Sequence, residues 1–350
     1  MIDIAAAEGV RNVGLLGIGA YRPRRIVTNA EICERIDSTD EWIVSRSGIH
    51  TRHFASADET VRAMSVIAGQ RAIDNSGIDP AEIGALILAT STWPQQVPHG
   101  APVVAFDLGI NGVAAMDLTA GCSGFGHGMA VGADLIRAGS AKYTLVIGVE
   151  RMSDGLDMTN RGNCFIFGDG AGAVVLGPTE RNGISPVVWG SDGEHSQAIR
   201  QNHTIVDYME MGANATGPIG KMTLEMDGST VFRWAAITLP KAIHQTLTSA
   251  GVTTEDIEVF VPHQANARIS EVMKKHLGFG DDVPMANDIA TTGNTSSASI
   301  PLAMEELLRT GKAKEGQTAL LLGFGAGLTY AGQVVTLPPA PAPVTDPDHL

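Results

Sequence analysis

Cysteine is scarce in this 350-residue chain. The three cysteines, Cys33, Cys122 and Cys164, are too few and too far apart for a disulfide framework, and no C-x-x-C pair indicates a zinc site. We therefore expect no metal and a reducing, cytoplasmic location. The N-terminus lacks the basic and then apolar order of a secretory signal. No apolar run is long enough to span a bilayer, so we expect no membrane partner.

Positive charge is also in short supply. Lys and Arg number 24 against 38 Asp and Glu, the net charge is −14, and the longest basic run is Lys274-Lys275-His276. A chain with this charge repels a phosphate backbone, so nucleic acid is excluded as a partner. Charged residues make up only 18% of the chain and apolar residues 44%, which predicts a globular protein with a large core.

The segment around Cys122 is predicted to be a buried strand that ends at this cysteine, followed by a helix that Gly139 stops. The unpaired N–H groups of a first helical turn favour an anion. We therefore expect them to lower the pKa of the Cys122 thiol and make it a nucleophile. The alternative is that Cys122 is an inert, buried apolar side chain.

An internal repeat organises the chain. Residues 76–88 and 250–261 share one helix–turn–strand pattern, and residues 135–141 and 307–313 share another, with a period of about 172 to 174 residues. This period is typical of a duplicated α/β half rather than a solenoid. We expect an N-terminal half over residues 1–182, a C-terminal half over 183–338 and a disordered, proline-rich tail over 339–350. The same register places Cys122 and Asn294 at equivalent corners of the two halves.

Three other segments bear on function. Residues 37–49 are predicted to form a helix that presents Trp42 and Arg46 on one face, either as a core tryptophan with a solvated arginine or as a wall for a nucleotide-bearing ligand. Residues 94–102 are expected to be a loop, and residues 185–232 to be irregular covering loops.

His263 and Asn294 are the remaining candidates. His263 follows a buried strand, which is where α/β enzymes place their chemistry, although a lone histidine is more often structural. Asn294 precedes a helix predicted over residues 297–308, where capping is its ordinary role. With Cys122, all three lie at strand-to-helix corners of a duplicated fold, which favours a shared function.

At these positions the chain resembles the thiolase-fold condensing enzymes, most closely the β-ketoacyl-acyl-carrier-protein synthase III family of type II fatty acid synthesis. The resemblance is carried in family order by residues 37–49, 120–125, 167–173, 261–266, 293–301 and 323–327, and residues 161–167 resemble actinobacterial members. It implies a thiolase-like α/β fold, in which two pseudo-symmetric halves form a layered αβαβα core. It also implies that the enzyme is a homodimer.

The resemblance implies two half-reactions. Cys122 takes an acyl group from acyl-CoA, which is a substrate, and no permanently bound cofactor is expected. His263 and Asn294 then donate hydrogen bonds to the thioester oxygen of malonyl-acyl-carrier protein as CO₂ leaves. The enolate attacks the acyl group, and the backbone N–H groups of Cys122 and Ala326 hold the oxyanion.

Further residues acquire roles from the same resemblance. Trp42, Arg46 and Arg161 match residues that hold the adenine and phosphates of CoA. Val97 matches a position that reaches across the dimer interface to floor the partner's acyl pocket. Because valine is smaller than the aromatic residues found there in some acetyl-specific members, we expect longer or branched primers.

Arg233, Arg268 and Lys275 match basic positions near the tunnel mouth, where an acidic carrier protein would dock, although a solvated helix face is the alternative. Two other functions stay open. The first is a polyketide or secondary-metabolite priming synthase, or an acyltransferase, of the same fold. The second is a non-catalytic module that binds acyl-CoA or the carrier protein.

Overall fold

The computed structural model describes residues 8–215, 217 and 219–343. Its first sheet has five strands in the order β1-β7-β6-β4-β5. β1, β7 and β6 pair antiparallel, whereas β6, β4 and β5 pair parallel. The bounds are β1 (Val13–Tyr21), β4 (Ile83–Ala89), β5 (Ala114–Leu118), β6 (Tyr143–Arg151) and β7 (Asp169–Pro178).

A second sheet of four strands has the order β11-β12-β13-β8. The pair β11–β12 is parallel and the pair β12–β13 is antiparallel, as are β4–β6 and β6–β7 in the first sheet. The bounds are β8 (Val188–Ser191), β11 (Val259–Pro262), β12 (Thr318–Gly325) and β13 (Thr329–Thr336). The two sheets therefore repeat one local topology, as the internal sequence repeat suggests.

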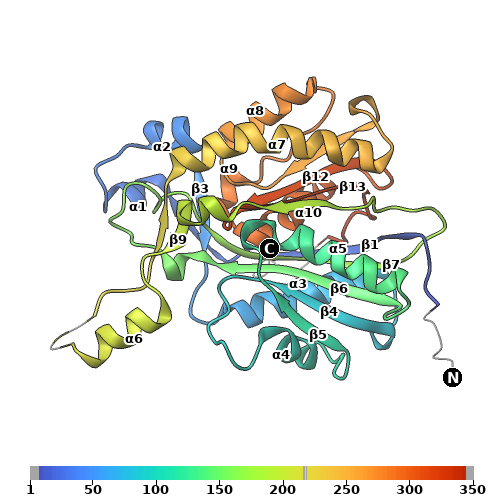
Figure 1. Ribbon diagram of the computed structural model, residues 1–350, viewed down its shortest axis with the longest axis horizontal. Coiled ribbons are helices and arrows are strands. Elements are labelled where there is room, and N and C mark those ends of the chain that lie inside the picture. Colours follow the sequence, from blue (N-terminus) through green and yellow to red (C-terminus); the bar gives the residue numbers. More distant parts are fainter. Residues whose placement is uncertain (1–7, 216, 218, 344–350) are drawn as a thin grey trace.

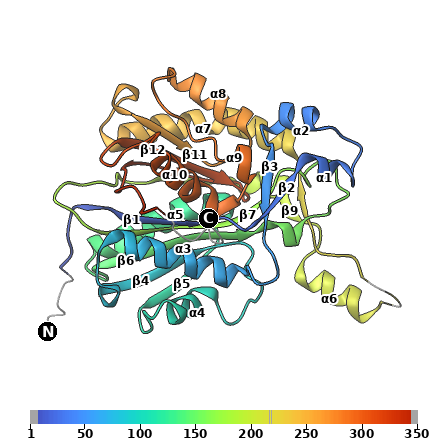
Figure 2. The same ribbon diagram turned by 180° about the vertical axis from the view of Figure 1, so that it is seen from behind.

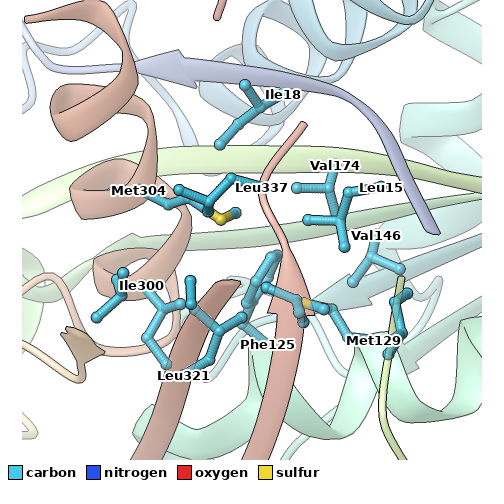
Figure 3. Packing of buried hydrophobic residues seen from close by; sticks show 14 of the residues in the cluster. Leu15, Ile18, Phe125, Met129, Val146, Val174, Ile300, Met304, Leu321 and Leu337 are labelled. Atoms are coloured by element: carbon cyan, nitrogen blue, oxygen red, sulfur yellow. The ribbon is translucent and has the colours of Figure 1, made fainter. Parts of the chain in front are cut away.

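Two helices, α5 (Gly124–Arg137) and α10 (Ser299–Arg309), lie between the sheets and supply the centre of the core (Figures 1 and 3). Phe125 of α5 and Met304 of α10 pack with Val174 of β7 and Leu321 of β12. Both helices are buried over most of their length because a sheet covers each side.

Outer helices complete five layers. The helices α3 (Val61–Ser76) and α4 (Gly100–Asp107) cover the first sheet, and α7 (Gly228–Ala250) and α8 (Ala267–Leu277) cover the second (Figure 1). The layered αβαβα core predicted from the sequence is confirmed.

The remaining elements are shorter, and most of them lie toward one end of the two sheets (Figure 1). They are β2 (Arg25–Thr28), α1 (Asn29–Cys33), α2 (Asp40–Ser47), β3 (Thr51–Phe54), β9 (Ile199–Gln201), α6 (Ile205–Ala213), β10 (Leu224–Met226) and α9 (Ile289–Thr292). Short 3-10 turns lie at Pro80–Glu82, Gly121–Ser123, Met152–Gly155, Gly193–Ala198, Thr254–Asp256 and Ser296–Ala298. Figure 2 shows α6 projecting away from the body, and none of its residues is buried.

Three local predictions are corrected by the structure. The strand before Cys122 is neither fully buried nor as long as expected: β5 is an edge strand that ends at Leu118, and Cys122 lies in the turn that follows. The expected loop over 94–102 ends earlier, because α4 begins at Gly100. The segment 185–232 is not only loops, since it contains β8, β9, α6, β10 and the start of α7.

Part of the predicted tail, residues 344–350, lies outside the described residues, whereas the backbone N–H of Ala342 donates to Asn75 Oδ1 at 3.1 Å. Among the helices of the described residues, none combines the length and the apolar character needed to cross a membrane.

Candidate active site

The three residues singled out from the sequence line one cavity. Its volume is about 810 Å³ including the open mouth, and its wall includes Cys122, His263, Asn294 and Ala326. Cys122 comes from the first half of the chain, and the other three come from the second. The structure therefore brings together residues that are up to 204 positions apart in the sequence.

Cys122 lies in the 3-10 turn Gly121–Ser123, directly before α5. The turn passes close to the end of β12, and a Cβ atom on Gly325 would lie 2.8 Å from Cys122 Sγ. Only glycine leaves room for the sulfur at this crossing. Gly121 has a φ of +53°, a left-handed conformation that a glycine adopts without strain.

Cys122 is 8% exposed, and burial raises the pKa of its thiol to about 11. The Ser296 hydroxyl and the backbone N–H groups of Ala326 and Cys122 act in the opposite direction, while the charge of Glu150 raises the pKa further. The predicted lowering of the thiol pKa is therefore wrong for the resting protein. Desolvation outweighs the donors at the helix start, and the thiol is neutral near pH 7.

His263 is 1% exposed, and its ring lies edge-on to Phe324 with centroids 5.1 Å apart. Its Nδ1 lies 2.6 Å from Ser299 Oγ, which also accepts the Gln264 N–H at 3.3 Å. We assign the hydroxyl proton of Ser299 to the bond with Nδ1, which leaves the ring proton on Nε2. Burial lowers the pKa of His263 to about 3, so the imidazole is neutral and Nε2–H is a donor.

Asn294 is oriented by backbone on both sides. Its Oδ1 accepts the Ser296 N–H at 2.8 Å, so its Nδ2 amide is the donor left for the cavity. The Asn294 N–H donates to Ile166 O at 2.8 Å, and its carbonyl accepts the Gly168 N–H at 3.0 Å. The Phe-Gly-Asp-Gly motif of the first half thus holds the asparagine of the second.

The proposed oxyanion donors converge on the nucleophile. The backbone N–H groups of Ala326 and Cys122 both lie close enough to the Cys122 sulfur to lower its pKa. Thr329 Oγ1 lies 2.9 Å from Ala120 O and 3.0 Å from Ala326 O, which ties the two loops together. Thr329 was not anticipated from the sequence, because nothing in its own segment marks it.

Ser296, Ser299 and Glu150 were also missed. Both serines fall within the motif over residues 293–301 that carries Asn294, so their positions carried a signal. The position of Glu150 also carried a signal in the sequence, since this acid directly follows the apolar run Tyr143 to Val149.

Comparison with known proteins agrees with this geometry. The family model "3-Oxoacyl-[acyl-carrier-protein (ACP)] synthase III" matches residues 116–193, and the C-terminal model of the same name matches residues 247–337. The β-ketoacyl-[acyl-carrier-protein] synthase III of Mycobacteroides abscessus is 56% identical over 97% of this chain and 99% of its own length. Its counterpart from Mycobacterium marinum is 52% identical, again over 97% and 99% of the two chains.

The chain belongs to the β-ketoacyl-[acyl-carrier-protein] synthase III family. As a synthase III it is a condensing acyltransferase that initiates fatty acid synthesis, so the family and activity predicted from the sequence are confirmed.

Solved structures agree on the fold. The priming β-ketosynthase of the R1128 polyketide pathway superimposes with a TM-score of 0.92 at 43% identity and covers 97% of this chain and 99% of its own. The synthase III of Aquifex aeolicus superimposes with a TM-score of 0.85 at 31% identity and covers 93% and 100%. The thiolase-like fold is confirmed.

In this synthase III chain, Trp42, Arg46 and Arg161 lie together. The guanidinium carbon of Arg46 is 5.7 Å from the Trp42 ring centroid, and that of Arg161 is 4.5 Å away. The cluster lies next to the cavity, because Asn266, which lines the cavity, donates to Arg46 O at 3.0 Å.

The three basic residues expected at the mouth of the synthase III cavity are all exposed, with Arg233 on α7 and Arg268 and Lys275 on α8. Arg268 lies over Phe232, with its guanidinium carbon 5.8 Å from the ring centroid, and Phe232 lines the cavity. On α7 and α8 together, Glu271 is the only acid, so this face is positive on an acidic protein.

Val97 is 82% exposed and is not among the residues that line the cavity of its own chain.

Within the described part of the chain, no group of His, Cys, Asp and Glu side chains has the arrangement of a metal site.

Proposed function

We propose that this cavity performs both half-reactions of a decarboxylative Claisen condensation, between a primer acyl-CoA and malonyl-acyl-carrier protein. The observation that carries the proposal is the convergence of one thiol with two neutral donors, His263 Nε2–H and the Asn294 amide, on the same cavity wall. A thiol nucleophile needs an acyl donor, and paired neutral donors suit an oxygen that becomes negative.

In the first half-reaction, Cys122 attacks the thioester carbonyl of acyl-CoA. The carbonyl oxygen becomes negative and is held by the backbone N–H groups of Cys122 and Ala326. CoA leaves as its thiol, and the acyl group stays on the sulfur. Trp42, Arg46 and Arg161 hold the adenine and phosphates of the CoA, because a stacked ring with two guanidinium groups suits both.

In the second half-reaction, malonyl-acyl-carrier protein docks on the positive face with Arg233, Arg268 and Lys275. Its thioester oxygen accepts hydrogen bonds from His263 Nε2 and Asn294 Nδ2. Loss of CO₂ then places negative charge on that oxygen, and one such preorganised donor typically contributes roughly 3 to 4 kcal/mol. The resulting enolate carbon attacks acyl-Cys122, which releases the thiolate.

Substitution of the two donors tests this division of labour. His263→Ala and Asn294→Ala are expected to keep acyl transfer to Cys122 within several-fold and to lower CO₂ release from malonyl-acyl-carrier protein by about 100- to 1,000-fold. Cys122→Ala should block acyl transfer altogether. Loss of acyl transfer with normal CO₂ release in His263→Ala would contradict the proposal.

The proposal extends to a homodimer in which Val97 of each chain forms the floor of the acyl pocket of the other chain. A valine at this position leaves room for longer or branched primers. A panel of acyl-CoA primers tests the pocket, and turnover of acetyl-CoA far above every longer acyl-CoA would refute the preference for longer primers.

Three free cysteines suit a reducing compartment, so we also propose a cytoplasmic location.

The priming-synthase alternative is less well supported, since the curated relatives at 51–56% identity are named as synthase III and the polyketide priming enzyme is 43% identical. An acyltransferase that forms no carbon–carbon bond would release no CO₂. A non-catalytic module would acquire no acyl group on Cys122.

A further inference from the structure

Glu150 is a buried acid that neither half-reaction above uses. Its side chain is completely enclosed at the end of β6, and no ion pair among residues 8–215, 217 and 219–343 includes it. A buried carboxylate without a cation is costly unless hydrogen bonds hold it. A buried acid of this kind beside an active site is therefore a candidate for a functional role.

Hydrogen bonds surround this carboxylate. The Ser91 N–H donates to both oxygens at 3.1 and 3.2 Å, and hydroxyls of Thr92, Ser296 and Ser297 donate at 2.7, 3.1 and 3.0 Å. The Thr90 hydroxyl lies at 3.4 Å, and Gly170 of β7 is the residue opposite on the neighbouring strand. These hydrogen-bond partners are all neutral, and the charge of Glu150 raises the pKa of the Cys122 thiol.

Ser296 connects this carboxylate to the nucleophile. Its hydroxyl donates to Glu150 Oε1 at 3.1 Å. Ser296 and Cys122 also line the same cavity, and the Ser296 hydroxyl lies close enough to the thiol of Cys122 to lower its pKa. Ser296 is also the one residue other than glycine with a positive φ among those described, at +50°, and its N–H is bound by Asn294 Oδ1. Backbone strain of this kind is maintained where the surrounding structure fixes a functional side chain.

His263 is not available as the base for the thiol. With the tautomer assigned above, its Nδ1 accepts from Ser299 and its Nε2 already carries a proton. A second proton would create a buried imidazolium, and burial holds the pKa of His263 near 3. A neutral thiol with its pKa raised to about 11 nevertheless has to lose its proton to attack a thioester.

We propose that Ser296 and Glu150 form a proton relay that deprotonates Cys122 during acyl transfer from acyl-CoA. The Sγ proton passes to Ser296 Oγ while the Ser296 hydroxyl proton passes to Glu150 Oε1. The sulfur lone pair forms the bond to the carbonyl carbon, and the C–S bond to CoA breaks with its electron pair on the CoA sulfur. The proton then returns from Glu150 through Ser296 to the departing CoA thiolate.

The relay is favourable because it moves charge without creating any. Before transfer the carboxylate carries one negative charge, and after transfer the sulfur carries it beside the N–H groups of Cys122 and Ala326. Burial raises the pKa of Glu150, so this carboxylate accepts a proton more readily than an exposed one. The condensation step needs no base, because there the cysteine leaves as a thiolate, which then takes up a proton from water to restore the thiol.

This inference rests on the proposed function. One experiment tests the relay and the proposed function separately: single-turnover acylation of Cys122 by an acyl-CoA, measured by mass spectrometry between about pH 6 and pH 9. Glu150→Gln and Ser296→Ala are expected to acylate about 100-fold more slowly near pH 7, as expected for loss of general-base help. Their rates should rise about tenfold per pH unit, since only the free thiolate then reacts, whereas the wild-type rate should depend less on pH.

Ser297→Ala is the matched control. Its hydroxyl lies 3.0 Å from Glu150 Oε1 and 2.9 Å from Ala89 O, but Ser297 does not line the cavity that holds Cys122. Its acylation rate should therefore stay within about threefold of wild type. Each variant, once fully acylated by long incubation, should condense with malonyl-acyl-carrier protein at the wild-type rate.

Two results would overturn the relay. One is wild-type acylation rates and pH profiles in Glu150→Gln and Ser296→Ala. The other is an equal loss in Ser296→Ala and Ser297→Ala, which would show that the carboxylate only supports the local structure. Failure of the wild-type protein itself to acquire an acyl group would instead contradict the proposed function.

Discussion

Cys122 shows how burial and backbone donors compete at one residue. The start of α5 and the N–H of Ala326 favour a thiolate, but desolvation and the charge of Glu150 favour the thiol and raise its pKa to about 11. The resting enzyme is therefore not preactivated. The thiol therefore has to lose its proton before the sulfur can attack a thioester.

Thiolate absorbance in the ultraviolet tests this directly. The difference between wild type and Cys122→Ser should show almost no thiolate at about pH 7, because the raised pKa keeps the proton on the sulfur, and absorbance should grow as the pH approaches about 11. A full thiolate signal at neutral pH would show that the helix start, and not burial, dominates.

Gly325 is the second prediction at this scale. A Cβ atom there would lie 2.6 Å from Cys122 Cβ and 2.8 Å from its sulfur, so Gly325→Ala must displace the nucleophile. A displacement of this kind costs on the order of 100-fold in acylation rate. Gly155→Ala is the control, because a side chain at that glycine meets no atom within 4 Å. Equal rates in the two variants would contradict the close crossing of the turn and β12.

At the residue scale, the sequence was sufficient to select Cys122, His263 and Asn294, since each lies in a short motif at a predicted corner. The protonation states could not be predicted. They depend on Ser299, which follows His263 by 36 positions, and on Glu150, which follows Cys122 by 28. Only packing reveals such partners.

The short helix α2 is the clearest case of an element that positions a binding residue. Thr39 caps its start by accepting the Trp42 N–H at 3.2 Å, and Gly48 ends it with a φ of +77°. With both ends fixed, Trp42 is held edge-on to Phe165 at 5.5 Å and offers its face to Arg161.

Trp42→Ala tests the role of this element. The KM for acyl-CoA should rise by about tenfold, in line with loss of a stacking platform. Transfer from a short acyl thioester that lacks the nucleotide should be unchanged, because Cys122 and its donors are untouched. An equal loss with both substrates would show that Trp42 supports the fold and does not bind the nucleotide.

Long apolar elements such as β6 and α5 could be predicted, whereas β8, β9 and β10 were missed. These strands are three or four residues long and are stable only because they pair with chain that is distant in sequence, such as β8 with β13. The exposed edge position of β5 was missed for the same reason: an apolar run does not reveal whether a second neighbour covers it.

For the molecule as a whole, exposed apolar side chains gather near the edge of the first sheet. Phe106 of α4 is 65% exposed and Met116 of the edge strand β5 is 37% exposed, while Val97 lies in the loop before α4. An unpaired strand edge with apolar neighbours is a typical site of association. This surface supports the proposal of a homodimer through β5 and α4.

Phe106→Asp should therefore reduce the molecular mass in solution from that of a dimer to that of a monomer, because the charge would be buried in the interface. Light scattering after size-exclusion chromatography measures the mass. Ile237→Asp is the control, since Ile237 is similarly exposed at 64% and belongs to α7, a helix that lies on the opposite side of the molecule from α4 (Figure 1). A dimeric Phe106→Asp variant would place the interface elsewhere.

The duplication was visible in the sequence because both halves keep the same turn residues before their buried strands. It predicted that equivalent corners approach each other, and Cys122 and Asn294 do line one cavity. The boundary between residues 182 and 183 stays a prediction. The chain crosses from the first sheet to the second between β7 and β8.

The most direct measurement is the mass of the intact protein after mixing with an acyl-CoA, with the modified residue located by peptide mapping. We predict one acyl group per chain, on Cys122, which disappears when malonyl-acyl-carrier protein is added and CO₂ is released. An unmodified protein, or an acyl group on Cys33 or Cys164 instead, would contradict the account.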